Sequence, residues 1–263
     1  MMTANSEMTQ DLTRDRATPD HLAGPAAGDP QRITGRQLCA GIGASAALGA
    51  VLATAITLIA RVAAPHWART EGLTVLIVAA VYLSVVAGLT IGVGGPRGVS
   101  RLLALRRPTA RQLGLSLVAL LAAVAAGIGV SLAFSSLSGG VPATMEAIVR
   151  AGSDEARLPT ATALTWALIV IRLVALTGTA EELLFRGAIY GWLRRRASVS
   201  VSIAITALLF TTEHGYYPIL IPLVLSYGLA AGWVRHRTSS TATTIAMHIT
   251  IDLALFLAAV ALS

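Results

Sequence analysis

The chain lacks lysine and carries few charged side chains of any kind. All 20 basic residues are arginine, and charged residues make up only 13% of the 263. A soluble protein of this length carries about 25%. Because 55% of the residues are hydrophobic, the deficit argues against an ordinary soluble domain and predicts a polytopic membrane protein. Basic residues of a single type are typical of a GC-rich genome, so we expect a bacterial source.

Several other features are scarce or absent. Cys39 is the only cysteine, so the chain forms no disulfide within itself. The sequence has no His-Glu-x-x-His, no Gly-x-Ser-x-Gly and no paired Asp within an apolar run, which argues against zincin-type, serine-hydrolase and aspartyl intramembrane chemistry. The net charge of +7 does not indicate a nucleic-acid partner, since the arginines flank apolar runs as membrane orientation requires.

Seven long apolar runs predict an all-α transmembrane bundle. Each reaches or approaches the roughly 17 to 25 residues needed to cross a bilayer. We expect spans at about 38–60, 73–95, 113–135, 160–192, 198–215, 217–234 and 243–262. Residues 1–36 are polar and predict a disordered tail. We assign residues 37–159 to amino-terminal spans and loops, and residues 160–263 to a catalytic membrane domain with its cavity among the last four spans.

The arginines alternate between rich and poor loops, which predicts the orientation in the cell membrane. The rich segments are the tail and the loops after the second, fourth and sixth spans. We therefore expect a cytoplasmic amino terminus and an external carboxyl terminus. The basic segment 96–112 is partly amphipathic and should lie on the cytoplasmic face. Residues 136–159 form the longest polar loop.

The fourth run contains the residues least expected in lipid, Glu181, Glu182 and Arg186. Each ionised group costs roughly 2.5 to 3.5 kcal/mol or more in a bilayer, so such residues are functional candidates. Glu182 and Arg186 are four apart and share a helix face, where they can pair. Glu181 lies about 100° around the helix and remains available as a general base. The alternative is a structural salt bridge that pins helices together.

Two later runs add histidines. His214 ends the fifth run, and Phe210 precedes it by one turn, where its ring would wall a pocket and fix the His214 rotamer. His214 is equally compatible with an interfacial position next to Gly-Tyr-Tyr-Pro. His248 and Asp252 are also four apart, so the Asp can hold one ring nitrogen and select the tautomer of the His. A buried His–Asp pair without chemistry is the alternative.

Together these groups can bind and deprotonate a water molecule and stabilise an oxyanion. Glu181, His214 and His248 are also a ligand set that can hold a divalent metal such as zinc. The sequence leaves open whether a metal is used, and it indicates no organic cofactor.

The three motifs resemble those of the CPBP family of intramembrane proteases, also called CAAX amino-terminal proteases or the Abi family, which includes the eukaryotic CAAX prenyl protease 2. The family pattern is Glu-Glu-x-x-x-Arg, Phe-x-x-x-His and His-x-x-x-Asn or Asp. This chain has Glu181-Glu182 with Arg186, Phe210 with His214, and His248 with Asp252, in that order. The resemblance covers about residues 160–262.

The resemblance implies roles for these residues. Glu181 and His214 would activate the water, His248 and Asp252 would help to stabilise the oxyanion, and Glu182 and Arg186 would organise the site. The family is called metalloprotease by name, although glutamate-dependent hydrolysis without a tightly bound metal is also proposed for it.

From these residues we expect an endopeptidase that acts on membrane-associated peptides or proteins within the lipid bilayer. Two non-enzymatic alternatives remain. One is an immunity or scaffold protein with an idle site, and the other is a proton-coupled transporter. The transporter should show internal repeats and broken helices, which the sequence does not display.

Overall fold

The structure is a computed structural model that describes residues 33–63, 71–92, 95–137, 167–168, 170–214 and 220–262. Within these ranges every regular element is a helix, which confirms the predicted all-α class. Among the helices of the described ranges, four are long and apolar enough to cross a membrane, and a shorter apolar helix spans Val199–Glu213. The protein is therefore a helical membrane protein.

The helices follow the predicted spans closely. The amino-terminal part contains α1 (Gly35–Ala63), α2 (Glu71–Gly92), the short α3 (Pro96–Leu103) and α4 (Ala110–Leu137). The carboxyl-terminal part contains α9 (Val199–Glu213), α10 (Ile221–Thr238) and α11 (Thr241–Leu262). The predicted disordered tail and the polar loop after α4 fall almost wholly outside the described residues.

Between them runs a composite helix, which we call the central helix. It consists of η3 (Ile171–Thr177), α7 (Gly178–Glu182), η4 (Leu183–Ile189) and α8 (Tyr190–Leu193). The backbone at each junction keeps right-handed helical dihedral angles, so the helix continues past Arg186 without a break. Two wide π-helical segments flank Glu181 and Glu182. Such segments are uncommon and concentrate at functional sites.

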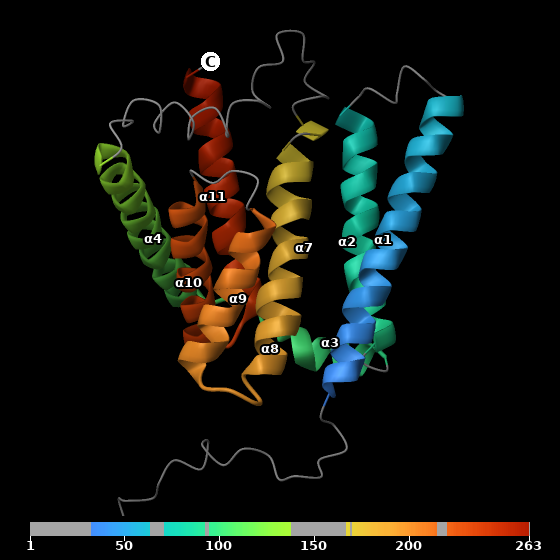
Figure 1. The fold of residues 1–263 in the computed structure, drawn as a ribbon, viewed down its shortest axis with the longest axis horizontal. Helices are drawn as coiled ribbons and strands as arrows, with labels where there is room; N and C mark the ends of the chain where they lie inside the picture. Colours follow the sequence, from blue (N-terminus) through green and yellow to red (C-terminus); the bar gives the residue numbers. More distant parts are fainter. Residues whose placement is uncertain are drawn as a thin grey trace, which may run out of the picture. The chain divides into compact units, whose positions relative to one another are not determined.

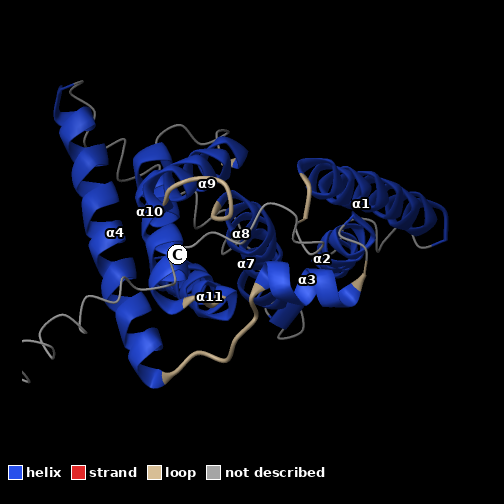
Figure 2. Ribbon diagram, turned by 90° about the horizontal axis from the view of Figure 1, so that it is seen from below, coloured by secondary structure: helices blue, strands red, loops and turns tan. Residues whose placement is uncertain are grey.

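The central helix lies in the middle of the helical bundle. It contacts α2, α3, α9, α10 and α11. Viewed from below, α7 and α8 lie between the group α1, α2 and α3 and the group α4, α9, α10 and α11 (Figure 2). Successive long helices run in opposite directions (Figure 1). The central position gives side chains of this one helix access to three of the helices that follow it.

Small residues permit the close approach of the helices. A Cβ at Gly88 would lie 2.3 Å from the Ser45 hydroxyl oxygen, and one at Gly191 would lie 2.7 Å from the Leu102 carbonyl oxygen. Glycine at these positions allows α2 to pack on α1, and α8 to pack on α3, with the backbones almost in contact. The short helix α3 is thereby held against the central helix.

Several hydroxyl groups inside the bundle are satisfied within their own helix. In α9, Ser202, Thr206 and Thr211 each donate a hydrogen bond to the carbonyl four residues earlier. This arrangement lets polar side chains be buried in an apolar bundle without an external partner. Helix α9 begins at the Ser198 cap, whose hydroxyl accepts from the Val201 amide, and it carries His214 at its other end.

Candidate active site

The fully buried part of the site is an ion pair between Glu182 and Arg186. Their side chains have no exposed area, and Arg186 Nη1 donates to Glu182 Oε1 at 3.0 Å. Arg186 Nη2 donates to the carbonyl oxygen of Gly228 at 3.3 Å, and the guanidinium lies 4.3 Å from the centre of the Phe210 ring. Pairing with a carboxylate and an aromatic face offsets the cost of burying the cation.

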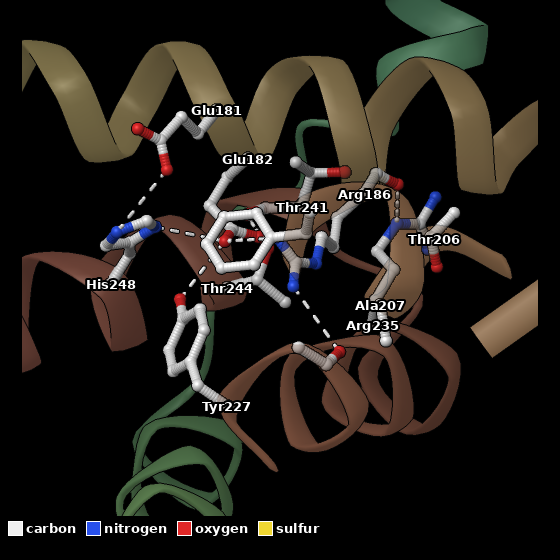
Figure 3. A network of polar contacts seen from close by, with 12 residues as sticks. Glu181, Glu182, Arg186, Thr206, Ala207, Tyr227, Arg235, Thr241, Thr244 and His248 are labelled. Atoms are coloured by element: carbon white, nitrogen blue, oxygen red, sulfur yellow. Dashed lines mark hydrogen bonds and ion pairs between the residues drawn. The ribbon is translucent and has the colours of Figure 1, made fainter. Parts of the chain in front are cut away.

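Glu182 Oε1 accepts two further hydrogen bonds from other helices. The Tyr227 hydroxyl in α10 donates to it at 3.0 Å, and His248 Nδ1 in α11 lies at 3.1 Å (Figure 3). An ionised carboxylate only accepts, so His248 Nδ1 carries the proton in this contact. One carboxylate oxygen thus ties the central helix to both α10 and α11.

This contact differs from the pairing that the sequence suggested for His248. The i, i+4 spacing favours Asp252 as the partner that selects the tautomer. Asp252 Oδ1 instead lies 3.6 Å from His248 Nε2, which is longer than a hydrogen bond. Glu182, 66 residues away in the chain, makes the closer contact and orients the ring.

Glu181 faces the two histidines with a single oxygen atom. Its Oε2 lies 3.9 Å from His214 Nε2 and 3.8 Å from His248 Nε2. These distances exceed a direct hydrogen bond, and Glu181 Oε2 has no hydrogen-bond partner among the described residues. The structure therefore brings the residues of all three sequence motifs together from the central helix, α9 and α11.

The His214 ring is held from its other side. His214 Nδ1 lies 3.0 Å from the Phe210 carbonyl oxygen, and the two rings are 4.6 Å apart between centroids. Because a carbonyl only accepts, Nδ1 donates in this contact, and Nε2 lies on the side of the ring that faces Glu181. Phe210, which is buried, thus packs against both His214 and Arg186.

Exposure separates the cluster into two layers. Glu182 and Arg186 are inaccessible, whereas the side chains of His248, Glu181, Asp252 and His214 are 8%, 15%, 22% and 25% exposed. The accessible layer holds the groups with proton-transfer chemistry, and the inaccessible layer holds the groups that position them. This order suits a site in which a substrate approaches Glu181 and His214.

Three contributing residues were not singled out from the sequence. Tyr227 lies in an apolar run, and a single tyrosine there does not by itself indicate a site. The available signal was that a buried tyrosine hydroxyl usually requires a partner. Gly228 supplies a carbonyl to Arg186. Gly178 makes room, because a Cβ there would lie 3.0 Å from His248 Cγ and 3.2 Å from Asp252 Oδ2.

The spacing of the donors does not fit a bound metal ion. Two ligands of one tetrahedral zinc ion at about 2.0 Å lie about 3.3 Å apart, whereas the Glu181 oxygen is 3.8 and 3.9 Å from the two nitrogen atoms. Among the described residues, no group of three His, Cys, Asp or Glu side chains has a geometry that would hold a metal.

Residues 163–254 match a family model described as Type II CAAX prenyl endopeptidase Rce1-like. This match supports the resemblance of the segment to the CPBP family of CAAX proteases. The matched segment contains every residue of the polar cluster, from Glu181 to Asp252. It does not include α1, α2, α3 or α4. Comparison of the chain with curated proteins and with solved structures gives no significant match.

Proposed function

We propose that this protein is an intramembrane endopeptidase that hydrolyses peptide bonds of membrane-associated peptides or proteins with an activated water molecule. The observation that carries the proposal is the position of Glu181 Oε2, which lies 3.9 Å from His214 Nε2 and 3.8 Å from His248 Nε2. A carboxylate between two imidazoles, in a segment that resembles the CAAX protease family, is suited to deprotonate water.

The first step is the activation of the water. A water molecule between Glu181 Oε2 and His214 Nε2 donates one hydrogen bond to each, since both atoms present lone pairs. His214 thereby orients the water, and Glu181 accepts its proton. The hydrogen bond from His214 Nδ1 to the Phe210 carbonyl keeps the ring in the tautomer that accepts at Nε2.

The resulting hydroxide attacks the carbonyl carbon of the scissile bond. A C–O bond forms, and the carbonyl π electrons move to the oxygen. His248 lies next to this position and donates from Nε2 in its doubly protonated form, which stabilises the oxyanion. When the C–N bond breaks, Glu181 returns the proton to the leaving amine nitrogen.

The remaining groups balance charge and fix positions. Carboxylates lie at both nitrogen atoms of His248, with Glu182 at Nδ1 and Asp252 at 3.6 Å from Nε2. They offset the positive charge of the imidazolium while it donates. Arg186 compensates Glu182 and never contacts the substrate. No step passes through a metal, because the donor spacing does not fit one.

Hydropathy and the distribution of arginines support a reaction that takes place at the cell membrane. We propose that the chain lies in a bacterial cell membrane as a multi-pass protein, with the arginine-rich ends of the helices on the cytoplasmic side. The substrate is a peptide or protein associated with the lipid bilayer, because the accessible layer of the cluster lies among apolar helices.

The test compares wild type with Glu181→Gln, which keeps the shape of the side chain and removes the base. Membrane-peptide termini are mapped by mass spectrometry in cells that express each form at matched levels, and the purified proteins are then assayed on the peptides found. We expect the rate to fall by roughly 10²- to 10⁴-fold. The control is Glu213→Gln, the same change at an exposed carboxylate beside His214, which should retain activity.

Identical termini for wild type and Glu181→Gln, with both proteins folded and expressed, would reject the protease. That result would favour a scaffold or immunity protein with an idle site. Proton uptake that depends on Glu181 in sealed vesicles, without cleavage, would favour a transporter.

A further inference from the structure

A second polar feature lies at the carboxyl end of the central helix, beyond Glu181 and Arg186. A cavity of about 310 Å³ is bounded by the end of α8, the turn that follows it, the end of α10 and α3. It is lined by Leu102, Tyr190, Gly191, Arg194, Arg195, Arg235, His236 and Ser239. The lining therefore carries three guanidinium groups and one imidazole, and it includes no carboxylate. Its volume is at the small end of the range for ligand sites.

The arginines of this cavity lack anionic partners within the described part of the chain. The ion pairs found there involve Arg186, His214 and His248 with acidic residues of the catalytic cluster. None of them reaches Arg194, Arg195 or Arg235. Three cations around one small cavity repel one another unless an anion joins them.

Hydrogen bonds to nearby backbone carbonyls involve only some of the arginines at this end of the central helix. Arg194 Nη1 donates to the Ala197 carbonyl at 2.6 Å, and Arg196 Nη1 donates to the Trp192 carbonyl at 3.1 Å. The Arg196 contact caps the end of the central helix, as basic residues commonly do, whereas the Arg194 contact holds the turn that follows the helix. Arg195 makes no such side-chain hydrogen bond within the described residues. It remains available for a ligand.

Arg235 is held in place by a hydrogen bond from only one of its three guanidinium nitrogen atoms. Its Nε donates to the Arg186 carbonyl at 3.2 Å (Figure 3), and the residue is 8% exposed. Neither Nη atom has a hydrogen-bond acceptor among the described residues. A guanidinium anchored through Nε presents its two terminal nitrogen atoms as a fork, which matches the oxygen atoms of a phosphate.

Tyr190 adds a neutral donor to the same cavity. The residue is 3% exposed, and its hydroxyl lies close to Arg194 without a well-formed hydrogen bond in the described part of the structure. A buried hydroxyl without a partner costs free energy. An anion in the cavity would accept from this hydroxyl and remove that cost.

We propose that this cavity binds a phosphate group, with Arg194, Arg195, Arg235 and Tyr190 as donors. The phosphate can belong to the headgroup of an anionic phospholipid or to a soluble phosphate. Basic cavities between helices at the membrane surface have the chemistry that recognises lipid headgroups. The proposal is independent of peptide hydrolysis, because no donor of this cavity belongs to the catalytic cluster.

The test is a binding titration of the full-length protein in a neutral detergent. The ligands are dioctanoyl phosphatidic acid, inorganic phosphate and dioctanoyl glycerol, which lacks the phosphate. The test variants are Arg195→Gln and Arg194→Gln. The control is Arg237→Gln, which removes the same charge near the end of α10 that borders the cavity but lies outside the cavity lining.

We expect phosphatidic acid to bind wild type and the Arg237→Gln control with similar affinity. Arg195→Gln and Arg194→Gln should each weaken binding about tenfold or more, as the loss of one charge-assisted hydrogen bond implies. Dioctanoyl glycerol should not bind at this site. If inorganic phosphate displaces the lipid, the cavity also accepts soluble phosphate, and if it does not, the ligand is a headgroup.

Equal weakening by Arg195→Gln and Arg237→Gln would overturn the proposal, because it would show diffuse attraction to a basic surface. Equal binding of the glycerol compound would also overturn it. The same titration on Glu181→Gln should give the wild-type affinity whether or not the protein is a protease, so the two proposals fail separately.

Discussion

Glu182 Oε1 lies 3.1 Å from His248 Nδ1, so a carboxylate of the central helix orients an imidazole of α11. The same oxygen accepts from Arg186 and Tyr227. Glu182 is thus the point at which the central helix, α10 and α11 are joined. Substitutions around it should separate effects on stability from effects on the proposed reaction.

Replacing Glu182 with Gln should destabilise the protein strongly. The change keeps the size of the side chain but leaves the fully buried Arg186 without its counter-charge. Breaking a buried pair in this way costs about 3 to 5 kcal/mol. Thermal unfolding in detergent measures the effect, with Glu181→Gln as the control because Glu181 makes no direct hydrogen bond to another described side chain. Equal melting temperatures would show that Arg186 does not depend on Glu182.

Tyr227→Phe removes one hydroxyl and keeps the ring. The lost hydrogen bond to the Glu182 carboxylate should cost about 1.5 to 3 kcal/mol. The contacts of the ring with Phe210 and His248 remain. We therefore expect a folded protein with a lower melting temperature and a reduced hydrolysis rate, because His248 is held less firmly. An unchanged rate and melting temperature would argue against any role for this hydroxyl in the site.

Gly178→Ala should impair the site although alanine favours helix formation by about 1 kcal/mol. The new Cβ would lie 3.0 Å from His248 Cγ and 3.2 Å from Asp252 Oδ2, so the imidazole must move. Hydrolysis rates measure the loss. Gly129→Ala in α4, where a Cβ meets nothing within 4 Å, is the matched control and should retain full activity. Full activity of Gly178→Ala would show that His248 can shift without consequence.

Removal of divalent metals should leave hydrolysis unchanged. The distances of 3.8 and 3.9 Å from Glu181 Oε2 to the two histidines are too long for ligands of one zinc ion. The measurement is the cleavage rate before and after dialysis against a chelator, with a metal-dependent protease treated in parallel. Loss of activity that zinc restores would contradict this prediction and would require the three side chains to move together.

Much of the fold could be predicted from hydropathy. In the described part of the chain, helices occupy all seven expected spans, and most of the described ends differ by only a few residues. The expected start of the fourth span at 160 lies outside the described residues. Among the described ends, the largest shift is in α10, which continues through Arg235, His236 and Arg237 to Thr238, beyond the apolar run that defined the prediction. A helix needs no apolar residues where it leaves the lipid, so hydropathy marks the membrane boundary and not the helix end.

The contacts within the site were harder to predict. Sequence spacing detects partners on the same helix, such as Glu182 with Arg186, because residues four apart share a face. It cannot detect that Glu182 reaches Tyr227 and His248, since these contacts depend on how separate helices pack. The π-helical segments were also not predicted, because nothing in the apolar pattern of 160–192 distinguishes a wide turn from an α-helical one.

These wide turns determine where the central helix can lose a residue without rotating the site. Each π-helical turn accommodates the i to i+5 spacing instead of i to i+4. A residue lost from Leu183–Ile189 would therefore close a wide turn with little rotation of the flanking segments, whereas a residue lost from the α-helical Tyr190–Leu193 would rotate Glu182 by about 100° relative to the arginines that follow Leu193. Such a chain would keep the hydrophobicity that inserts it in the bilayer while its acidic face turned away from α11. Insertion depends on the composition of the span, whereas chemistry depends on its rotational phase.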